Sequence, residues 1–311
     1  MRTKSRVLLV SFAAVFLVLL GGTLPLVRDP LPRMNARRSA LAAVHKDSSF
    51  VEGGYVLTPV HLRATSGLAV DLLVRRAIAD SGRLALAVVL GGHLTGREAA
   101  RLVGSTPGVI VAAVSYPYDG DPRPHAAQLV RDIPRIRSAF LDTPPALMLA
   151  LDYLLSRPDV DARNVEAIGV SLGAPFVCIA GALDKRFTRV WAIHGSGGSF
   201  APLEANMRRT IPFTPLRVAA AAMANVIISG PRLDPVRWVQ EIAPRPFVMV
   251  NAESDERLPR TAIDALYRSA KNPKELIWMS GAHVHGDAAT IQRLQEIVLS
   301  RMVPAPSPAA E

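Results

Sequence analysis

Short, uninterrupted apolar runs alternate along most of the chain with longer stretches that have helical spacing. Residues 84–90 (LALAVVL) and 109–115 each have the length of one strand, and such unbroken runs are typical of strands buried on both faces. Residues 55–63 and 68–76 are instead joined by a short Ser-Gly turn, which predicts a β hairpin. A hairpin followed by repeated strand–helix units predicts an α/β domain with a mostly parallel sheet, helices on both faces and right-handed crossovers.

The later part of the chain continues this alternation, with one interruption. The pattern predicts further strands at 165–170, 189–194, 245–251 and 275–279, and helices at 145–157, 259–270 and 288–301. Residues 199–243 break the pattern, because five prolines surround an Ala-rich helical stretch at 217–228. An insertion between two core strands would lie above the carboxyl edge of the sheet. We therefore interpret residues 199–243 as a small lid insertion.

The first 27 residues combine a basic start with a nearly continuous apolar stretch. As a helix, residues 7–27 would span about 31 Å, which is close to the thickness of the hydrocarbon core of a bilayer. A small-residue cleavage site does not follow closely, so we expect residues 1–27 to form an uncleaved signal anchor, a transmembrane helix. The rest of the chain would then lie outside the cytoplasm, in the periplasm of a bacterium. Secretion after signal cleavage is the alternative.

Composition sets the remaining boundaries. Residues 28–50 contain two prolines and scattered charge and are interpreted as a tether. Residues 304–311 form a Pro/Ala-rich tail that we expect to be disordered. The α/β domain then occupies residues 51–303.

The positive charge of the chain is concentrated at its N-terminal end. The formal net charge is +10, of which residues 1–46 carry +7 and the remaining 265 residues +3. Basic residues beside an apolar segment suit anionic lipid headgroups, whereas the body lacks the basic stripe with interleaved aromatics that nucleic-acid binders use. We expect a membrane as a partner and no nucleic acid. The single cysteine, Cys178, excludes an internal disulfide and a Cys-based zinc site, and we expect neither a metal nor another cofactor.

The pentapeptide Gly169-Val-Ser-Leu-Gly173 lies where a predicted strand ends and a predicted helix begins. A nucleophile elbow has this arrangement, because its tight turn lifts a serine hydroxyl above the sheet and its flanking glycines avoid steric clashes. We therefore take Ser171 as the candidate nucleophile. The turn also places the Leu172 N–H at the start of a helix, where it can donate to an oxyanion.

A serine nucleophile needs a base, which is expected after it in the chain. His283 and His285 lie in a predicted loop between the last strand and the last helix. We choose His283 because it directly follows a Gly-Ala turn, and His285 is the alternative. His194 ends the strand after the nucleophile helix, too early for the base, and is interpreted as a residue of the site wall or the core.

The acid that orients the base is expected between the serine and the histidine. Asp255 follows an apolar strand, and its Asp-x-x-Leu-Pro spacing puts it on the loop immediately before a helix. Asp255 is therefore the preferred acid, with Glu253 and Glu256 as alternatives.

A second oxyanion donor is expected from the loop at residues 90–96. Its paired glycines, Gly91 and Gly92, allow the backbone to approach a substrate closely. The N–H of His93, or that of Leu94, would then point at the developing oxyanion.

Three of these segments together resemble the α/β-hydrolase superfamily, especially its dienelactone-hydrolase-like and acyl-esterase branches. They are the elbow in its Gly-Val-Ser-Leu-Gly-Ala-Pro form, the Asp-Glu-Arg-Leu-Pro loop and the Gly-Ala-His loop. The resemblance covers about residues 54–302 and implies an eight-stranded sheet that begins with an antiparallel hairpin, and cleavage of carboxylic esters through an acyl-serine. Two features depart from the family. Gly91-Gly92 replaces the more usual His-Gly, and dienelactone hydrolases use a Cys nucleophile, so lactone specificity is not implied.

These observations predict a membrane-tethered serine hydrolase that acts on small-molecule carboxylic esters. Ser171 would attack the acyl carbonyl, His283 would move the proton and Asp255 would orient the histidine. An apolar lid and a nearby bilayer favour a hydrophobic acyl substrate. An acyltransferase or a thioesterase would use the same triad, and a non-catalytic binding protein on an inactive hydrolase fold is the contrasting hypothesis.

Overall fold

The computed structural model describes residues 28–92, 95–121, 125–284 and 287–302. The signal anchor predicted at 1–27, the candidate residues His93 and His285, and the tail predicted at 304–311 lie outside these ranges. Within the described ranges, no helix combines the length and the apolar character that crossing a bilayer requires. The anchor, the membrane partner and the extracytoplasmic location therefore stay predictions.

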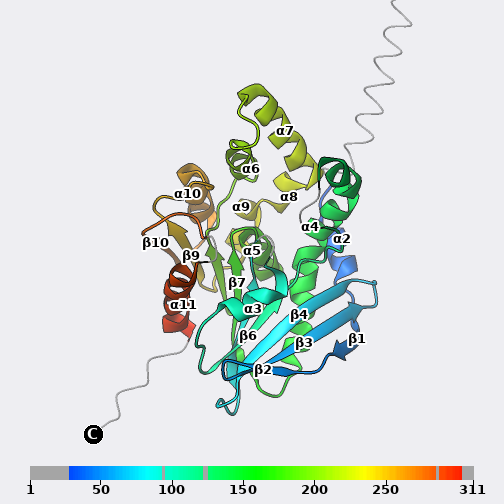
Figure 1. The fold of residues 1–311 in the computed structure, drawn as a ribbon, viewed down its shortest axis with the longest axis vertical. Coiled ribbons are helices and arrows are strands. Elements are labelled where there is room, and N and C mark those ends of the chain that lie inside the picture. The colour runs from blue at the N-terminus through cyan, green and yellow to red at the C-terminus, as the bar shows by residue number, and fades with distance from the viewer. Residues whose placement is uncertain (1–27, 93–94, 122–124, 285–286, 303–311) are drawn as a thin grey trace, which may run out of the picture.

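The ten described strands form one sheet at the centre of the molecule (Figure 1). Their order across the sheet is β1-β3-β4-β6-β5-β7-β8-β9-β10, and β2 pairs with β3 outside this path. The strands are β1 (Leu41–Lys46), β2 (Phe50–Glu52), β3 (Tyr55–Ala64), β4 (Ala69–Ala77), β5 (Leu84–Leu90), β6 (Val109–Val114), β7 (Val160–Val170), β8 (Arg189–Ile193), β9 (Phe247–Ala252) and β10 (Lys274–Met279). The six strands β6-β5-β7-β8-β9-β10 pair in parallel, and the hairpin β3–β4 is antiparallel as predicted.

The sheet differs in two ways from the eight-stranded, mostly parallel sheet that we expected. It is mixed, because β1 and β2 pair with β3, and β4 pairs with β6, in antiparallel fashion. It also has two more strands, since β3–β10 already account for eight. The added strands β1 and β2 cover backbone groups of β3 that would otherwise form an open edge of the sheet.

Composition led us to interpret residues 28–50 as a tether, but the structure has a helix and a strand there. This segment contains β1 and the helix α2 (Leu31–Arg37), which packs on α4 (Ala126–Leu155). Met34 of α2 is completely buried. Arg33 and Arg37 both form ion pairs with Asp142 of α4 at 3.1 Å. These arginines have a partner more than a hundred residues away in the sequence, which composition alone does not reveal.

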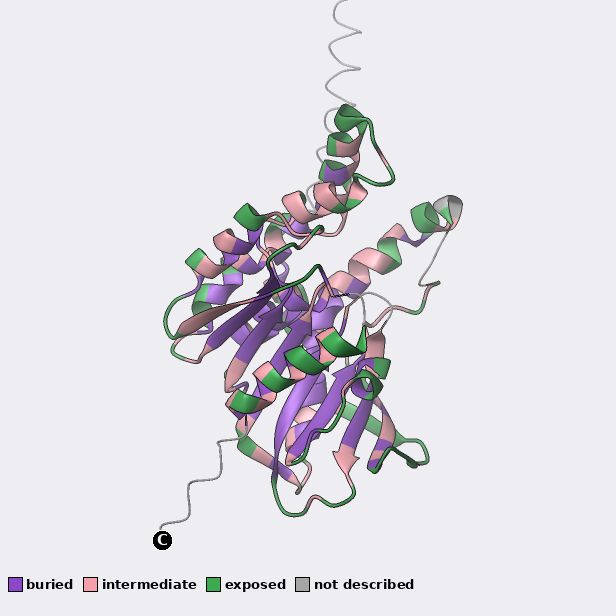
Figure 2. Cartoon of the chain, turned by 60° about the vertical axis from the view of Figure 1, so that its left-hand side comes forward, coloured by how far each residue is buried: buried purple, intermediate pink, exposed green. Residues whose placement is uncertain are grey.

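Helices cover both faces of the sheet, but unequally. One face carries α4, α5 (Gly173–Leu183) and α10 (Arg260–Ser269). The other carries α11 (Ala288–Met302) and the short α3 (Ala99–Leu102), which follows the 3-10 turn η1 (Gly96–Glu98). Figure 2 shows that the strands between these layers are largely buried, while the outer sides of the helices are exposed.

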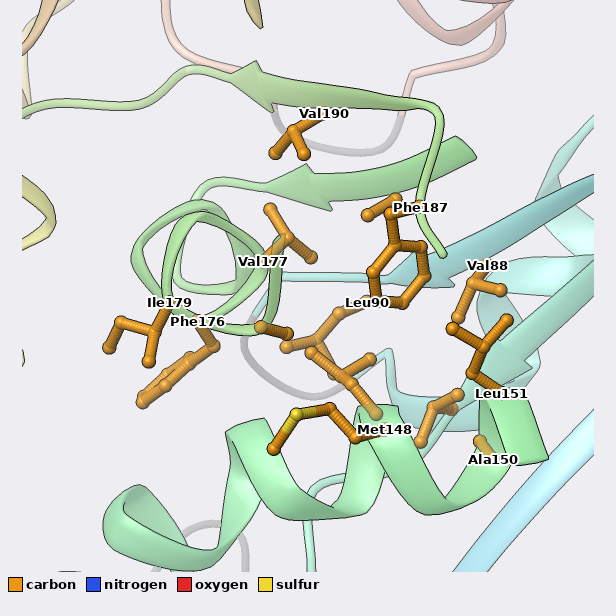
Figure 3. Close-up of a cluster of buried hydrophobic side chains, with 14 of the residues drawn as sticks. Val88, Leu90, Met148, Ala150, Leu151, Phe176, Val177, Ile179, Phe187 and Val190 are labelled. Atoms are coloured by element: carbon orange, nitrogen blue, oxygen red, sulfur yellow. The ribbon is translucent and has the colours of Figure 1, made fainter. Parts of the chain in front are cut away.

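Strand β5 shows how the sequence divides the core into two layers. All seven of its residues are buried, and successive side chains point to opposite faces. Val88 and Leu90 belong to the cluster between the sheet and α4 and α5, beside Met148 and Val177 (Figure 3). The smaller side chains of β5 belong to the other cluster, under α3 and α11.

The segment predicted as a lid connects β8 to β9 and is helical. It contains α6 (Phe200–Met207), α7 (Thr214–Ile227), α8 (Gly230–Leu233), α9 (Pro235–Trp238) and the 3-10 turn η2 (Val239–Glu241). Helix α7 corresponds to the predicted Ala-rich helix, and α6 and α7 project from one end of the molecule, at the top of Figure 1. A function as a lid stays a prediction.

Candidate active site

Ser171 lies in the tight turn between the end of β7 and the start of α5. Its φ of +53° is in the left-handed region, which residues other than glycine seldom adopt. The Ser171 N–H donates to the Ile193 carbonyl of β8 at 2.8 Å, and the Ser171 carbonyl accepts from the Ala174 N–H at 3.0 Å. These bonds hold the strained turn in the geometry of a nucleophile elbow.

The two glycines of the pentapeptide are required by space. A Cβ on Gly169 would lie 2.4 Å from Val177 Cγ2 and 2.5 Å from the Gly173 carbonyl oxygen. A Cβ on Gly173 would lie 2.2 Å from the Leu90 carbonyl oxygen at the end of β5. Because carbon and oxygen atoms cannot approach so closely, β7, α5 and β5 can come this near to one another only where glycine is present.

The structure brings together the serine, histidine and aspartate that the sequence singled out. Ser171 Oγ lies 2.8 Å from His283 Nε2, and His283 Nδ1 lies 2.8 Å from Asp255 Oδ2. The side chains of His283 and Asp255 are 1% and 2% exposed. They come from different loops that lie at the same edge of the sheet, because the carboxyl ends of the parallel strands meet there.

The Asp255 carboxylate has partners on both oxygens. Oδ1 accepts from the backbone N–H groups of Arg257 and Leu258, each at 2.9 Å, and Oδ2 faces the Nδ1 atoms of His194 and His283. Burial alone would raise the pKa of this carboxyl. The hydrogen bonds from the two imidazoles and the backbone outweigh burial and hold the pKa of Asp255 well below its usual range.

The ionised state of Asp255 determines the tautomers of both rings. A carboxylate can only accept hydrogen bonds, so Nδ1 of His194 and Nδ1 of His283 each carry a proton. In the neutral His283 ring, Nε2 is then the unprotonated atom, and it faces the Ser171 hydroxyl. This arrangement suits a base that accepts the serine proton.

His194 has a closer relation to the site than sequence reasoning assigned to it. It is 2% exposed, has a φ of +48° and donates from Nδ1 to Asp255 Oδ2 at 3.0 Å. Its ring lies edge-on to that of His283, with 4.8 Å between centroids. The signal that could have found this contact is that β8 and β9 end next to one another in a parallel sheet, which brings the residues after them together.

Two backbone segments lie beside Ser171, the start of α5 and the glycine loop after β5. The Leu172 N–H lies at the start of α5, where the helix dipole favours negative charge. A Cβ on Gly92 would lie 3.6 Å from Ser171 Cβ, so the glycine loop after β5 reaches the serine, whereas the predicted donors His93 and Leu94 lie outside the described residues. Tyr116 Oη donates to the Gly91 carbonyl at 2.7 Å and so fixes the start of this loop.

The alternative acids lie elsewhere around the site. Glu253 is exposed, and its backbone N–H donates to the Met279 carbonyl of β10 at 2.9 Å. Glu256 accepts from the His283 backbone N–H at 3.0 Å, so it contacts the backbone of the histidine and supports its loop.

Two cavities meet at Ser171. The first has a volume of about 480 Å³ and extends between the sheet and the helices α3 and α11. The second has a volume of about 360 Å³ and lies between Ser171 and the helical insertion. Ser171 and Arg257 border both cavities. An ester bound at Ser171 therefore has room on two sides.

His194, Asp255 and His283 also offer three potential metal-ligand atoms within 4.8 Å of one another. Both imidazoles face the shared carboxylate with Nδ1, at 2.8 and 3.0 Å. With Asp255 ionised, each Nδ1 carries the proton that bonds to the carboxylate, so neither Nδ1 atom is a metal ligand in this arrangement. The hydrogen bonds fully account for this cluster.

Comparison with known proteins rests on structure. The sequence matches no protein-family model and no curated protein. Among solved structures, the acetyl xylan esterase from Paenibacillus sp. R4 aligns with a TM-score of 0.65 and 16% identity, over 88% of this chain and 94% of that one. Acetyl xylan esterase 1 from a Thermoanaerobacterium species aligns with a TM-score of 0.61 and 14% identity, over the same shares of the two chains.

Further similar structures carry other esterase and hydrolase names. A glucuronoyl esterase from Solibacter usitatus aligns with a TM-score of 0.52 and 14% identity, over 88% of this chain and 91% of that one. An α/β hydrolase from a Penicillium species aligns with a TM-score of 0.53 and 18% identity, over 79% of this chain and 98% of that one. Together with the mixed sheet, its helical layers and the elbow at its carboxyl edge, these alignments establish that the chain has the α/β-hydrolase fold.

Proposed function

We propose that this protein is a serine hydrolase that cleaves carboxylic esters, with Ser171, His283 and Asp255 as its catalytic triad. The observation that carries the proposal is the unbroken line of contacts from Ser171 Oγ to His283 Nε2 and from His283 Nδ1 to Asp255 Oδ2, each 2.8 Å long. The proposal is also supported by the solved structures with a similar fold, which include acetyl xylan and glucuronoyl esterases, enzymes that act on carboxylic esters.

Acylation follows from the positions of these groups. As the Ser171 oxygen bonds to the ester carbonyl carbon, its proton passes to His283 Nε2. The carbonyl oxygen becomes an oxyanion, which accepts hydrogen bonds from the Leu172 N–H and the glycine loop. The tetrahedral species then breaks its bond to the alcohol oxygen, and His283 returns the proton to the departing alcohol.

Deacylation repeats these steps with water. His283 Nε2 takes a proton from the water, the water oxygen bonds to the acyl carbon, and the bond to Ser171 Oγ breaks as that oxygen regains a proton. Asp255 stays ionised throughout and stabilises the imidazolium that forms in each half of the reaction. Its depressed pKa suits this role, because the carboxylate keeps its charge at every pH at which the histidine can act as a base.

An alkyl fluorophosphonate probe, which labels activated serines, tests the nucleophile. The wild type and the surface control Ser300→Ala should be labelled, and Ser171→Ala should not. His283→Ala should slow labelling by about 10⁴-fold or more, since removal of the base leaves only the oxyanion donors and binding. Equal labelling of wild type and Ser171→Ala would show that the nucleophile is assigned wrongly.

We also propose that residues 1–27 hold the protein at a membrane with the α/β domain outside the cytoplasm. The support is the apolar stretch at residues 7–27 and the basic residues around it. Membranes washed with alkaline carbonate should retain the protein with its N-terminus intact. A mature chain that starts near residue 23 or 44 would contradict the anchor and indicate secretion.

A further inference from the structure

The cavity beneath α11 lies on the face of the sheet that carries α3 and α11. Among the described residues, α3 contributes four residues to this layer and α11 contributes fifteen. The strands present small or branched apolar side chains there. The walls include Ala87, Val89, Val111, Ile168, Leu294 and Val298. An unfilled apolar cavity forfeits dispersion contacts along its walls, and an apolar ligand would restore them.

This cavity is long as well as apolar. It begins at Ser171 and Gly91, at the carboxyl edge, and extends to Val109 and Met302 at the opposite edge. Val109 pairs with Ala85 of β5, six residues before Gly91, which directly follows this strand. At the rise of a parallel strand, the residues that line the cavity therefore span about 20 Å along the sheet.

Hydrogen bonds fix both walls of the cavity. Gln295 of α11 accepts from the Gly104 N–H at 2.7 Å and donates to the Ser105 carbonyl, which ties α11 to the loop after α3. At the far end, Asn164 donates to the Met302 carbonyl at 2.8 Å. The space between α3 and α11 is thus built into the fold.

The position of His283 distinguishes the two cavities chemically. Among the described residues, His283 borders the second cavity and not the first. The histidine must return a proton to the departing alcohol, so the alcohol oxygen has to lie on its side of Ser171. The acyl group then extends away from the imidazole, past Gly92 and into the first cavity.

We infer that the first cavity binds the acyl chain and the second the alcohol, so that the substrates are esters of apolar acyl chains much longer than acetyl. The inference rests on the proposed function. It gives this chain a different acyl preference from the one that the names of the acetyl xylan esterases state for those proteins.

The first experiment uses the wild-type protein and p-nitrophenyl esters of acetate, butyrate, octanoate and laurate below their aggregation limits. Burial of one methylene is worth about 0.8 kcal/mol, which corresponds to about a fourfold gain in kcat/KM per added methylene. Incomplete burial lowers this limit, and we expect octanoate to exceed acetate by at least about 100-fold. Acetate cleaved as fast as octanoate would overturn the inference.

Two variants locate the effect. Val111→Phe fills the middle of the first cavity, and Leu299→Trp, on the partly exposed side of α11, narrows its far end. Both should lower the octanoate-to-acetate ratio of kcat/KM at least tenfold. Val250→Phe overpacks the same face of the sheet but borders neither cavity, so it should leave the ratio unchanged. If Val111→Phe does not fold, Leu299→Trp and the wild-type ester series still test whether the first cavity binds the acyl chain.

Three outcomes separate the possible failures. If no ester is cleaved and the fluorophosphonate probe does not label Ser171, the proposed function fails. If acetate is cleaved but longer chains bring no gain, only the acyl assignment fails. If lengthening the alcohol in a series of alkyl acetates brings the gain, and Leu299→Trp removes it, the two cavities are assigned in reverse.

Discussion

A single methyl group added at Gly173 should damage catalysis more than it damages the fold. The new Cβ would lie 2.2 Å from the Leu90 carbonyl oxygen and 3.0 Å from that of Gly91, whereas ordinary contacts begin at 3.4 Å. The start of the glycine loop must therefore move by about 1 Å, and overpacking of this kind typically costs about 1–3 kcal/mol. The same loop carries Gly92 against Ser171. A 1 Å misplacement of a catalytic group can cost about 100-fold in rate, so we expect kcat to fall by that factor.

The assay compares Gly173→Ala with Gly181→Ala in the same helix. A Cβ on Gly181 would lie 2.4 Å from Val190 Cγ2, so this variant is also overpacked, but about 12 Å farther along α5. Both should lower the Tm by about 2–12 °C, whereas only Gly173→Ala should lower kcat per folded molecule. Titration of active sites with the fluorophosphonate counts the folded molecules. If Gly173→Ala keeps kcat within threefold of the wild type, the contact between the elbow and the glycine loop does not control catalysis.

Three further results follow from individual contacts. His194→Leu should lower kcat/KM about 10- to 100-fold, because a hydrogen bond to a charged carboxylate is worth about 1.5–3 kcal/mol. His194→Asn keeps a hydrogen-bond donor and should recover part of the loss. Equal kcat/KM in the wild type and both variants would contradict the role of His194. Asp142→Ala removes the ion-pair partner of Arg33 and Arg37, so it should lower the unfolding free energy by about 1–2 kcal/mol and speed proteolysis after α2. An unchanged cleavage pattern would contradict the proposal that these ion pairs hold α2 on α4. Hydrogen bonds to Asp47 and Asp71 raise the pKa of His61 above its ordinary value of 6.5. The stabilisation that His61 contributes to the fold should therefore be complete below pH 6.5 and be lost as the pH rises through the raised pKa. The difference in unfolding free energy between the wild type and His61→Gln should therefore shrink from about pH 5.5 to about pH 8.5, and a difference that grows would refute the linkage.

The elements of the site could be predicted where the signal was local. The pentapeptide around Ser171 determines a turn by its own glycines, and His283 and Asp255 each follow a strand within a few residues. The contact of His194 with Asp255 could not be predicted in this way, since 61 residues separate them and only the adjacency of β8 and β9 joins them. Sequence periodicity places strands, but it does not give their order in the sheet.

The fold was predicted less well where local preference and tertiary packing disagree. Helix α4 begins at Ala126, nineteen residues before the predicted start, and contains Pro134, Pro144 and Pro145. Prolines disfavour a helix interior, so local preference speaks against a helix that contains all three. Burial of residues such as Leu141 against the core outweighs that preference. The same conflict hid α2 and β1, whose charges and prolines resemble those of a linker.

The docked helix α2 also removes slack between the N-terminal segment and the body. A flexible linker of twenty-three residues would have a root-mean-square end-to-end distance of about 26 Å, since this distance grows with the square root of the linker length. With Met34 in the core and Asp142 holding two arginines, the chain enters the domain at one fixed point. An anchor at residues 1–27 would therefore restrict the orientation of the domain as well as its distance from the bilayer, and the mouth of the site would keep a defined angle to the lipid surface.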